Sequence, residues 1–188
     1  LLVAPVSLKN TLLDLIKEEI EKAKAGEETS IFLKMNSLTD RQLIDALKEA
    51  SQAGVKIKMI IRGICCILPG IEGKTDNIEV ISVVGRFLEH SRIFCFGTGE
   101  NMKMYIASAD WMTRNTENRV EIAAPIYDQK IKNSIYDTLR IMWKDNLKAR
   151  ILCSDGTYKK PEIKEGDELI DCQNYLRHEY KVGRKIKL

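Results

Sequence analysis

One stretch near the amino terminus constrains the fold more than any other, because it predicts a strand, a helix and a second strand in succession. Residues 30–36 carry the apolar run Ile31-Phe32-Leu33, which indicates a buried strand. The sequence Thr39-Asp40-Arg41-Gln42 fits a capping box that opens a helix, and Gly54 ends that helix. Residues 55–62 then predict a second strand. Two strands joined in this way run parallel, so we expect a sheet that is parallel at least in part.

The remaining pattern predicts helices and further strands around this unit. Apolar residues recur every four positions over residues 8–20, which predicts an amphipathic helix that starts at Ser7 and ends before Gly26. A later helix over residues 128–146 would carry on its inner face Ile131, Ile135, Leu139, Met142 and Trp143. We expect strands over residues 78–84, 93–96, 102–107, 119–125 and 148–152. The fold class that follows is α/β, a mixed sheet flanked by helices.

The length of the chain and its cysteines indicate one domain from a reducing environment. The 188 residues can bury one sizeable core, and the apolar runs are far shorter than the roughly 20 residues of a membrane span. The five cysteines form no C-x-x-C pair, so we expect free, buried thiols and a cytoplasmic protein, either free or attached to the membrane surface. Because residue 1 is Leu and no signal peptide follows, we expect a piece of a longer protein.

The carboxyl-terminal part of the chain shows a weaker pattern. After Asp155-Gly156 the sequence loses its periodicity, and residues 177–188 hold five basic residues against one acid. Such a tail is typically solvated and mobile, and we expect His178 within it at the surface. We therefore divide the chain into a domain over residues 1–153 and a partly irregular extension with a basic tail over residues 154–188.

Polar side chains follow the predicted strands at the points where these strands end. Lys34 and Asn36 close the first strand of the parallel unit, and Arg62 closes the second. Ser108-Ala109-Asp110 closes a later strand and is followed by Arg114. Ligands of open α/β sheets bind beyond the carboxyl ends of the strands. The pattern therefore predicts a polar site at one end of the sheet.

Arg62 and His90 are the candidates for direct contact with a ligand. An arginine directly after a buried strand needs a partner, which is either an internal carboxylate or a bound anion such as phosphate. Gly63 beside it would let a ligand approach the backbone. His90 is either a satisfied structural or surface group, or a residue that donates to phosphate, transfers protons or becomes phosphorylated. Arg114 is either a solvated turn residue or part of the same site.

Several functions are disfavoured by what the sequence lacks. The net charge of +3 is too small to indicate a protein that coats DNA. The chain contains no G-x-x-x-x-G-K-[ST] loop, no G-x-G-x-x-G, no H-E-x-x-H and no aromatic RNA-binding strand motif. A bound nucleotide would therefore be held by side chains rather than by a glycine-rich loop.

Several segments, taken in order along the chain, resemble one known family. The segments are residues 50–56 (ASQAGVK), 61–66 (IRGICC), 85–92 (GRFLEHSR) and 108–115 (SADWMTRN), with further matches at residues 1–5, 34–38 and 148–150. They resemble the last domain of the large, phosphohistidine-using polyphosphate kinases. The likeness extends over residues 1–175, nearly the whole chain.

This resemblance implies a phospholipase D-like fold and a transferase of the kinase class. The family reversibly transfers the terminal phosphate of ATP onto polyphosphate, in an active site that lies in a tunnel between domains. The histidine that becomes phosphorylated belongs to a domain outside this chain, so the resemblance implies that the fragment is inactive alone. It also implies as partners ATP or ADP, polyphosphate, the remaining domains and further copies in a homo-oligomer, and no nucleic acid.

The resemblance also implies roles for individual residues. Arg62 and His90 match positions that bind ATP phosphates, and His90 is the catalytic candidate, as an acid or base or as a contact to the transferring phosphate. Weaker expectations place on the path of polyphosphate Lys34, Arg86, Arg92 and Arg114. Mg²⁺ is expected together with ATP, although the sequence shows no ligand cluster for it.

Two competing functions can be weighed against this one. Phospholipase D enzymes carry the motif H-x-K-x-x-x-x-D, but counted from His90 the lysine position holds Arg92 and the aspartate position holds Gly97. This difference disfavours a lipase or a nuclease. The alternative from another class is a non-catalytic domain that binds polyanions or mediates oligomerisation.

Overall fold

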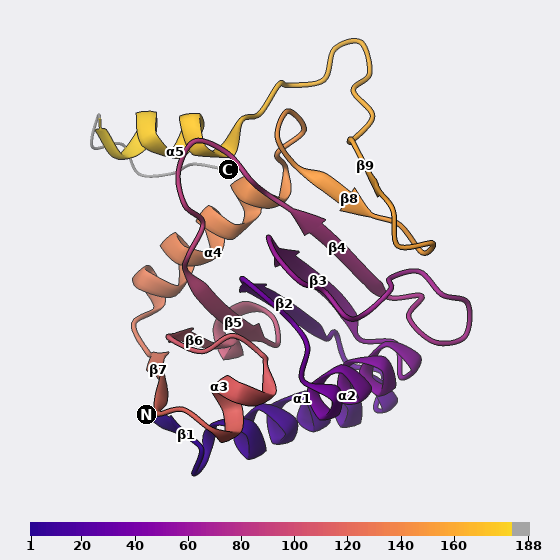
Figure 1. Cartoon of the computed structure of the whole chain (residues 1–188), viewed down its shortest axis with the longest axis vertical. Coiled ribbons are helices and arrows are strands. Elements are labelled where there is room, and N and C mark those ends of the chain that lie inside the picture. Colours follow the sequence, from indigo (N-terminus) through magenta and orange to yellow (C-terminus); the bar gives the residue numbers. More distant parts are fainter. Residues whose placement is uncertain (182–188) are drawn as a thin grey trace.

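The parallel unit predicted near the amino terminus forms the centre of the sheet in the computed structural model, which describes residues 1–181 (Figure 1). Strand β2 (Ser30–Met35), helix α2 (Arg41–Gln52) and strand β3 (Lys56–Ile61) follow one another as expected. β2 pairs parallel with β3, and β3 pairs parallel with β4 (Ile78–Ser82). The carboxyl ends of these three strands therefore lie at the same end of the sheet.

Antiparallel strands extend the sheet on both sides of this unit. They are β1 (Leu2–Ala4), β5 (Arg92–Phe96), β6 (Lys103–Ala107), β7 (Glu121–Ile126), β8 (Arg150–Leu152) and β9 (Tyr158–Lys159). Within the described residues the order is β1-β7-β6-β5-β2-β3-β4-β8-β9. β5 pairs antiparallel with β2, so β5 begins at the end of the sheet where β2 and β3 finish. The sheet is mixed, as the sequence predicts.

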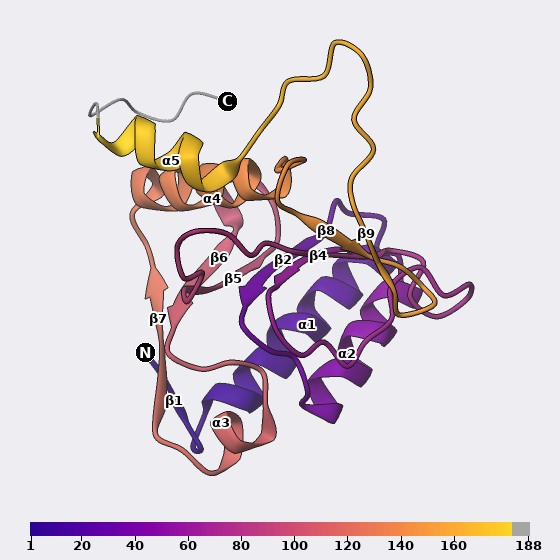
Figure 2. The same ribbon diagram turned by 45° about the horizontal axis from the view of Figure 1, so that its top comes forward.

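Helices cover the two faces of the sheet in separate pairs (Figure 2). α1 (Leu8–Lys24) lies beside α2 on one face, where their apolar side chains pack against one large core. α4 (Gln129–Trp143) and α5 (Cys172–Lys181) lie on the other face over a second core. A 3₁₀ turn (Gly99–Asn101) precedes β6, and the short helix α3 (Thr113–Glu117) follows it. No helix of the described part is long and apolar enough to cross a membrane.

The start of α2 differs from the predicted capping box by one residue. Asp40, rather than Thr39, caps the helix, and its carboxylate accepts from the backbone N–H groups of Gln42 and Leu43 at 3.1 and 3.2 Å. The same carboxylate also pairs with the Lys9 ammonium at 3.0 Å. A carboxylate is favoured here because it meets both the free N–H groups of the helix start and a buried cation.

Two other predictions need correction. Ile131, expected on the inner face of α4, is 51% exposed, because the packing of this helix on the second core begins one turn later, at Ile135. The thiols are free as expected, but Cys66 is exposed rather than buried.

The carboxyl-terminal extension is more regular than its sequence indicates. β9 lengthens the sheet, and α5 packs against α4, where the sequence shows no periodicity. His178 is exposed, as expected. The part of the predicted mobile tail over residues 182–188 lies outside the described residues, and the boundary between residues 153 and 154 stays a prediction.

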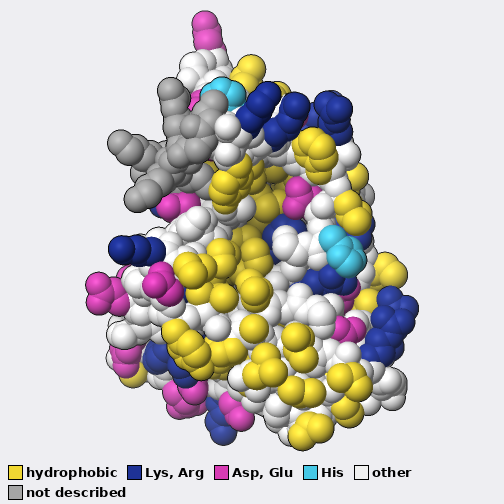
Figure 3. Space-filling view, turned by 90° about the vertical axis from the view of Figure 1, so that its left-hand side faces the viewer, with side chains coloured by type: hydrophobic (Ala, Val, Ile, Leu, Met, Phe, Trp, Pro, Cys, Tyr) yellow, Lys and Arg dark blue, Asp and Glu magenta, His cyan; other side chains and the backbone are white. Residues whose placement is uncertain are grey.

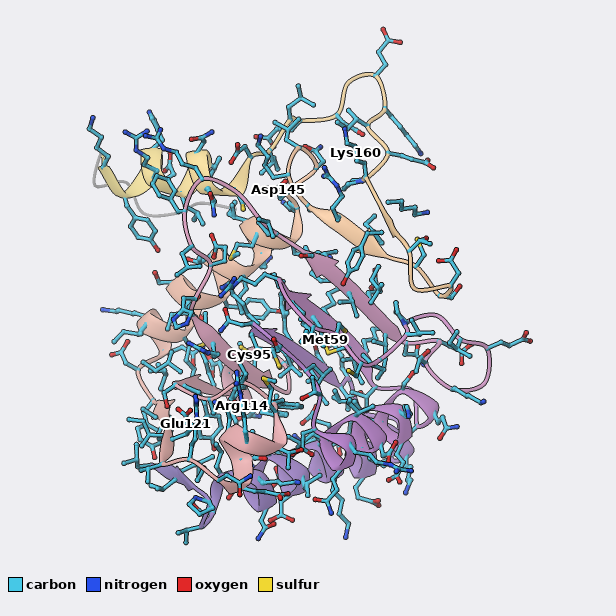
Figure 4. The ribbon with its side chains drawn as sticks, in the orientation of Figure 1. Met59, Cys95, Arg114, Glu121, Asp145 and Lys160 are labelled. Atoms are coloured by element: carbon cyan, nitrogen blue, oxygen red, sulfur yellow. The ribbon has the colours of Figure 1, made fainter. Side chains whose placement is uncertain are left out.

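Asp145 ties the end of α4 to the strand and the helix that follow it (Figure 4). Its carboxylate accepts from the backbone N–H groups of Lys148 at 2.7 Å, Ala149 at 2.9 Å and Cys172 at 2.8 Å. Burial alone would raise the pKa of this carboxyl, but the hydrogen bonds from Cys172 and the other N–H groups outweigh burial and lower the pKa below 3.8. Asp145 thereby fixes where α5 begins.

Candidate functional site

The predicted polar strand ends meet in one cleft, as the topology requires. Leu38, just beyond β2, forms bridges with Cys65 beyond β3 and with Trp111 beyond β6, which brings the three segments together. The cleft has a volume of about 520 Å³. Its walls are formed by Asn36, Ser37, Arg62, His90, Arg92, Ser108, Asp110, Arg114, Asn115, Arg119 and Glu121.

Asp110 organises the floor of this cleft. Its carboxylate accepts from the backbone and side-chain nitrogens of Asn36 at 2.7 and 3.0 Å, and from Arg92 Nε and Nη2 at 3.2 and 3.0 Å. The side chain is almost fully buried. Burial would raise the pKa of the carboxyl, but the bonds from Arg92 and Asn36 outweigh it and lower the pKa below 3.8. Asp110 is therefore an ionised anchor.

Arg62 is held by an amide instead of by a carboxylate. Arg62 Nε donates to Asn36 Oδ1 at 2.6 Å, while Asn36 Nδ2 donates to Asp110, so the three residues form one chain. Among residues 1–181 no carboxylate forms an ion pair with Arg62. The internal-carboxylate alternative is therefore absent from the described part. The nitrogens Nη1 and Nη2 of this guanidinium stay available to an anion.

Gly63, which the sequence suggested would admit a ligand, packs closely against the backbone of Asn36. A Cβ at Gly63 would lie 2.8 Å from the Asn36 carbonyl oxygen, and Gly63 N donates to that oxygen at 2.8 Å. The missing side chain thus lets the end of β3 approach the end of β2, which sets the Arg62–Asn36 contact.

The position of His90 is set by Arg92. Arg92 Nη1 lies 3.1 Å from His90 Nδ1 and donates to the His90 carbonyl oxygen at 2.9 Å. A guanidinium has no acceptor, so Nδ1 must accept and Nε2 carries the proton of the neutral ring. His90 is exposed, and its Nε2–H is the group that the ring can offer to an anion in the cleft.

The far wall comes from α3 and the start of β7. Arg114 and Glu121, both labelled in Figure 4, lie at this end of the sheet. Glu121 accepts from Ser108 Oγ and, at 2.7 Å, from Asn115 Nδ2. The other amide atom of that residue, Asn115 Oδ1, is buried and has no partner within the described residues. The side chains that this wall offers to a ligand are therefore mainly cationic, those of Arg114 and Arg119.

The structure does not bring all predicted residues to the cleft. Arg62, His90, Arg92 and Arg114 line it, whereas Lys34 and Arg86 do not. The Lys34 ammonium is buried and lies 3.2 Å from Glu89 Oε2, and burial lowers its pKa although Glu89 favours the charged form. The Arg86 guanidinium lies over the ring of Phe87, 5.6 Å from its centre. Lys34 therefore supports the loop that carries His90 instead of facing the cleft.

The charge of the cleft favours an anion. Four arginines line it against two carboxylates, and both carboxylates already accept hydrogen bonds from the protein. No group of three His, Cys, Asp or Glu side chains within residues 1–181 could hold a metal ion. The described residues thus offer no group of that kind to Mg²⁺, and a polyanion is the ligand that the four arginines of the cleft fit best.

Two residues of the cleft had no sequence signal. Arg119 and Glu121 precede or begin β7 instead of following a strand, so the pattern of polar strand ends does not include them. Asn36 and Asp110 do follow strands, but their pattern reveals neither that they bind each other nor that they hold Arg62 and Arg92. The parallel pairing of β2 with β3 brings Asn36 and Arg62 together, and the antiparallel return of β5 and β6 adds Arg92 and Asp110.

The fold and the cleft define the class of this protein as a phospholipase D-like α/β domain with an arginine-lined cleft at one end of its sheet. A phospholipase D family member, Nuc from Salmonella typhimurium, shares the fold with a TM-score of 0.57 over 85% of this chain and 96% of its own. Its sequence identity is 16%, so this likeness concerns the fold alone.

Sequence comparison gives the family. The model of polyphosphate kinase C-terminal domain 2 matches residues 1–173, and this chain belongs to that family. A polyphosphate kinase of Thermosynechococcus vestitus is 51% identical over 167 residues, which are 89% of this chain and 23% of the relative. One from Bacillus anthracis is 49% identical over 171 residues, 91% of this chain and 24% of the relative. The crystal structure of polyphosphate kinase from Porphyromonas gingivalis matches with a TM-score of 0.92 and 38% identity, over 97% of this chain and 28% of that chain. The chain thus spans about a quarter of the length of these curated relatives.

Proposed function

We propose that this chain forms one wall of the active site of a polyphosphate kinase, where it binds the phosphates of ATP and of polyphosphate. The observation that supports this most strongly is the Arg62 guanidinium, which has no carboxylate partner in the described part and shares a cleft with His90. In the reaction, the bond between the terminal phosphorus of ATP and the oxygen it shares with ADP breaks. The phosphoryl group ends on the terminal oxygen of polyphosphate, and the reverse reaction makes ATP.

The cleft residues contribute charge and alignment, which phosphoryl transfer needs most from a protein. Arg62 binds phosphate oxygens through its free nitrogens, while Asn36 holds its Nε. His90 donates its Nε2–H to an oxygen of the transferring or leaving group. Arg114 and Arg119 extend the cationic wall along the polyanion.

The other components of the reaction lie outside these residues. The phosphorylated histidine belongs to a domain that precedes this one in the family, so the chain is expected to be inactive alone. The Mg²⁺ that accompanies ATP would be held by the nucleotide and by other parts of the kinase, because this chain shows no site for it in its described part.

An exposed apolar surface beside the cleft supports contact with the rest of the kinase. Ile122, Ala124 and Ile126 are spaced two residues apart in β7, so their side chains lie on the same face of the sheet. α4 leaves this face partly uncovered, and Ile122 is exposed. Figure 3 shows this side of the molecule, where hydrophobic side chains gather in and below a hollow that basic side chains and a histidine border. Exposed side chains of this surface are Ile106, Val120, Ile122 and Ile131. Contiguous apolar surface of this kind is typical of an interface, and we assign it to the remaining domains or to a further copy of the kinase.

Replacing Arg62 with alanine in the full-length kinase is expected to raise KM for ATP about 10- to 100-fold, the loss that one or two charge-assisted hydrogen bonds would cause. Arg62→Lys should recover only part of the loss, because an ammonium cannot reproduce the planar fork of donors. Steady-state kinetics at fixed polyphosphate concentration measures the change.

Arg41→Ala is the matched control. The Arg41 side chain is 94% exposed at the start of α2, and within residues 1–181 its one ion pair is a 3.8 Å contact with Asp45. Arg41→Ala should leave KM unchanged. An equal KM for the Arg62→Ala enzyme and the wild type would show that Arg62 does not bind the nucleotide.

A further inference from the structure

The loop that carries His90 has little regular structure of its own. It connects β4 to β5, and residues 84–88 within it are all exposed. A loop of this kind samples many positions unless side chains from elsewhere hold it. Two buried polar side chains reach it, Lys34 from β2 and Gln173 from α5.

Gln173 holds the loop through every hydrogen-bonding atom of its amide. Its Oε1 accepts from Phe87 N at 2.9 Å, and its Nε2 donates to the Phe87 carbonyl oxygen at 2.8 Å. The second hydrogen of Nε2 is directed to Glu89 Oε1 at 2.7 Å. The amide thus pairs with the Phe87 backbone as a neighbouring strand would, and it reaches the residue directly before His90.

Gly85 shows how closely Gln173 approaches the loop. A Cβ at Gly85 would lie 2.4 Å from Gln173 Oε1, a distance that no real Cβ contact has. Any side chain at this position would therefore push the amide away from the loop. The contact therefore needs a glycine at position 85 and an amide side chain at position 173.

Lys34 holds the same segment from the opposite direction. Its ammonium lies 3.2 Å from Glu89 Oε2 and donates to Ser91 Oγ at 2.8 Å. Glu89 thus receives one partner on each carboxylate oxygen, Gln173 on Oε1 and Lys34 on Oε2. The residues on both sides of His90 are fixed to the body of the protein.

Gln173 is itself held in place by its neighbour in the core. Cys172, its neighbour, is fully buried, and its N–H donates to Asp145 at 2.8 Å. Asp145 also holds the first residues after α4, so the start of α5 cannot shift independently of the sheet.

We propose that Gln173 is a positioning residue, which holds His90 against the cleft by fixing the loop at Phe87 and Glu89. This inference rests on the proposed function, in which His90 contacts the transferring phosphate. Without the amide, the loop would spend only part of its time in the arrangement that presents His90, and turnover would fall by that fraction. Binding of ATP through Arg62 would change little, because Arg62 is held by Asn36 and not by the loop.

Gln173→Met in the full-length kinase tests this role, since methionine keeps the volume and loses all three hydrogen bonds. We expect kcat to fall about 10- to 100-fold, as for other small misplacements of a reacting group, while KM for ATP changes less than about threefold. Gly85→Ala disrupts the same contact from the side of the loop. It should likewise lower kcat and leave KM for ATP nearly unchanged. Because Gly85→Ala changes no residue of α5, a loss of kcat in this variant could not be explained by unfolding of that helix.

Asn174→Ala is the matched control on the same helix. Asn174 is exposed, and within the described part of the chain its side chain bonds to Asp171 alone, so this variant should keep wild-type kcat. Wild-type kcat in both Gln173→Met and Gly85→Ala, alongside a large loss in His90→Ala, would overturn the positioning role and leave the proposed function standing. Full activity of His90→Ala would instead overturn the proposed function, and the positioning role with it.

Discussion

Replacing His90 with alanine in the full-length kinase is expected to lower kcat about 10²- to 10⁴-fold, the contribution typical of a positioned proton donor. The loss should appear in kcat more than in KM for ATP, because the main phosphate contacts belong to Arg62. Arg92 engages Nδ1 of His90, so the ring of the wild type presents Nε2–H to the transferring group. The alanine variant offers no donor in its place. Initial rates of ADP formation measure the effect.

The chain provides a matched control for this substitution. His178, the second histidine, is exposed on α5, and its only polar contact in the described part is a 3.4 Å approach to Glu179. His178→Ala should retain wild-type kcat. If His90→Ala also retained it, His90 would have no part in the transfer, and the cleft would be at most a binding surface.

Replacing Asp110 with alanine is expected to destabilise the domain by about 3–5 kcal/mol, the usual cost of leaving one member of a buried ion pair without its partner. Arg92 would lose both bonds to the carboxylate, and Asn36 would lose the acceptor that orients it toward Arg62. The same change should therefore abolish phosphate binding. Urea unfolding of the 188-residue chain measures the stability. Asp45→Ala is the control, since Asp45 is half-exposed and its ion pairs in the described structure, with Arg41 and Lys48, lie at the surface.

The pH dependence of stability gives a second readout of Asp110. Its folded-state pKa lies below the ordinary value of 3.8, so its stabilising contribution is present above that value and is lost as the pH falls through the folded pKa. The free energy of unfolding of the wild type should therefore fall more steeply than that of Asp110→Asn as the pH is lowered below about 4. Parallel curves for the two proteins would show that Asp110 is not an ionised anchor.

Much of the fold could be predicted because the apolar pattern is strong where the sheet is buried on both faces. The β2-α2-β3 unit, α1 and the central strands lie within a few residues of their predicted bounds. α5 could not be predicted, because it rests on α4 through few apolar residues and is fixed largely by the polar contacts of Asp145 and Gln173. Such contacts between residues far apart leave no periodicity in the sequence.

The candidate site divides in the same way. Polar residues at strand ends indicate Arg62, and His90 is already a candidate by its residue type before the resemblance to a family gives it a role. Both residues line the cleft. The sequence pattern groups Lys34 with these strand ends, yet it lies within β2 and its ammonium is buried against Glu89 of the loop. A pattern of strand ends gives the end of the sheet where a site lies, but the partner of each side chain depends on chain segments that fold over it.

The central claim is that Arg62 and His90 form a phosphate site, and a titration of the 188-residue chain with tripolyphosphate, followed by amide and side-chain NMR, tests it most directly. We expect the signals of Arg62, His90 and Arg92 to shift together with one dissociation constant that rises with salt. Arg62→Ala should remove these shifts, and Arg41→Ala should not. Shifts confined to the lysines of other surfaces, or unchanged in Arg62→Ala, would contradict the claim.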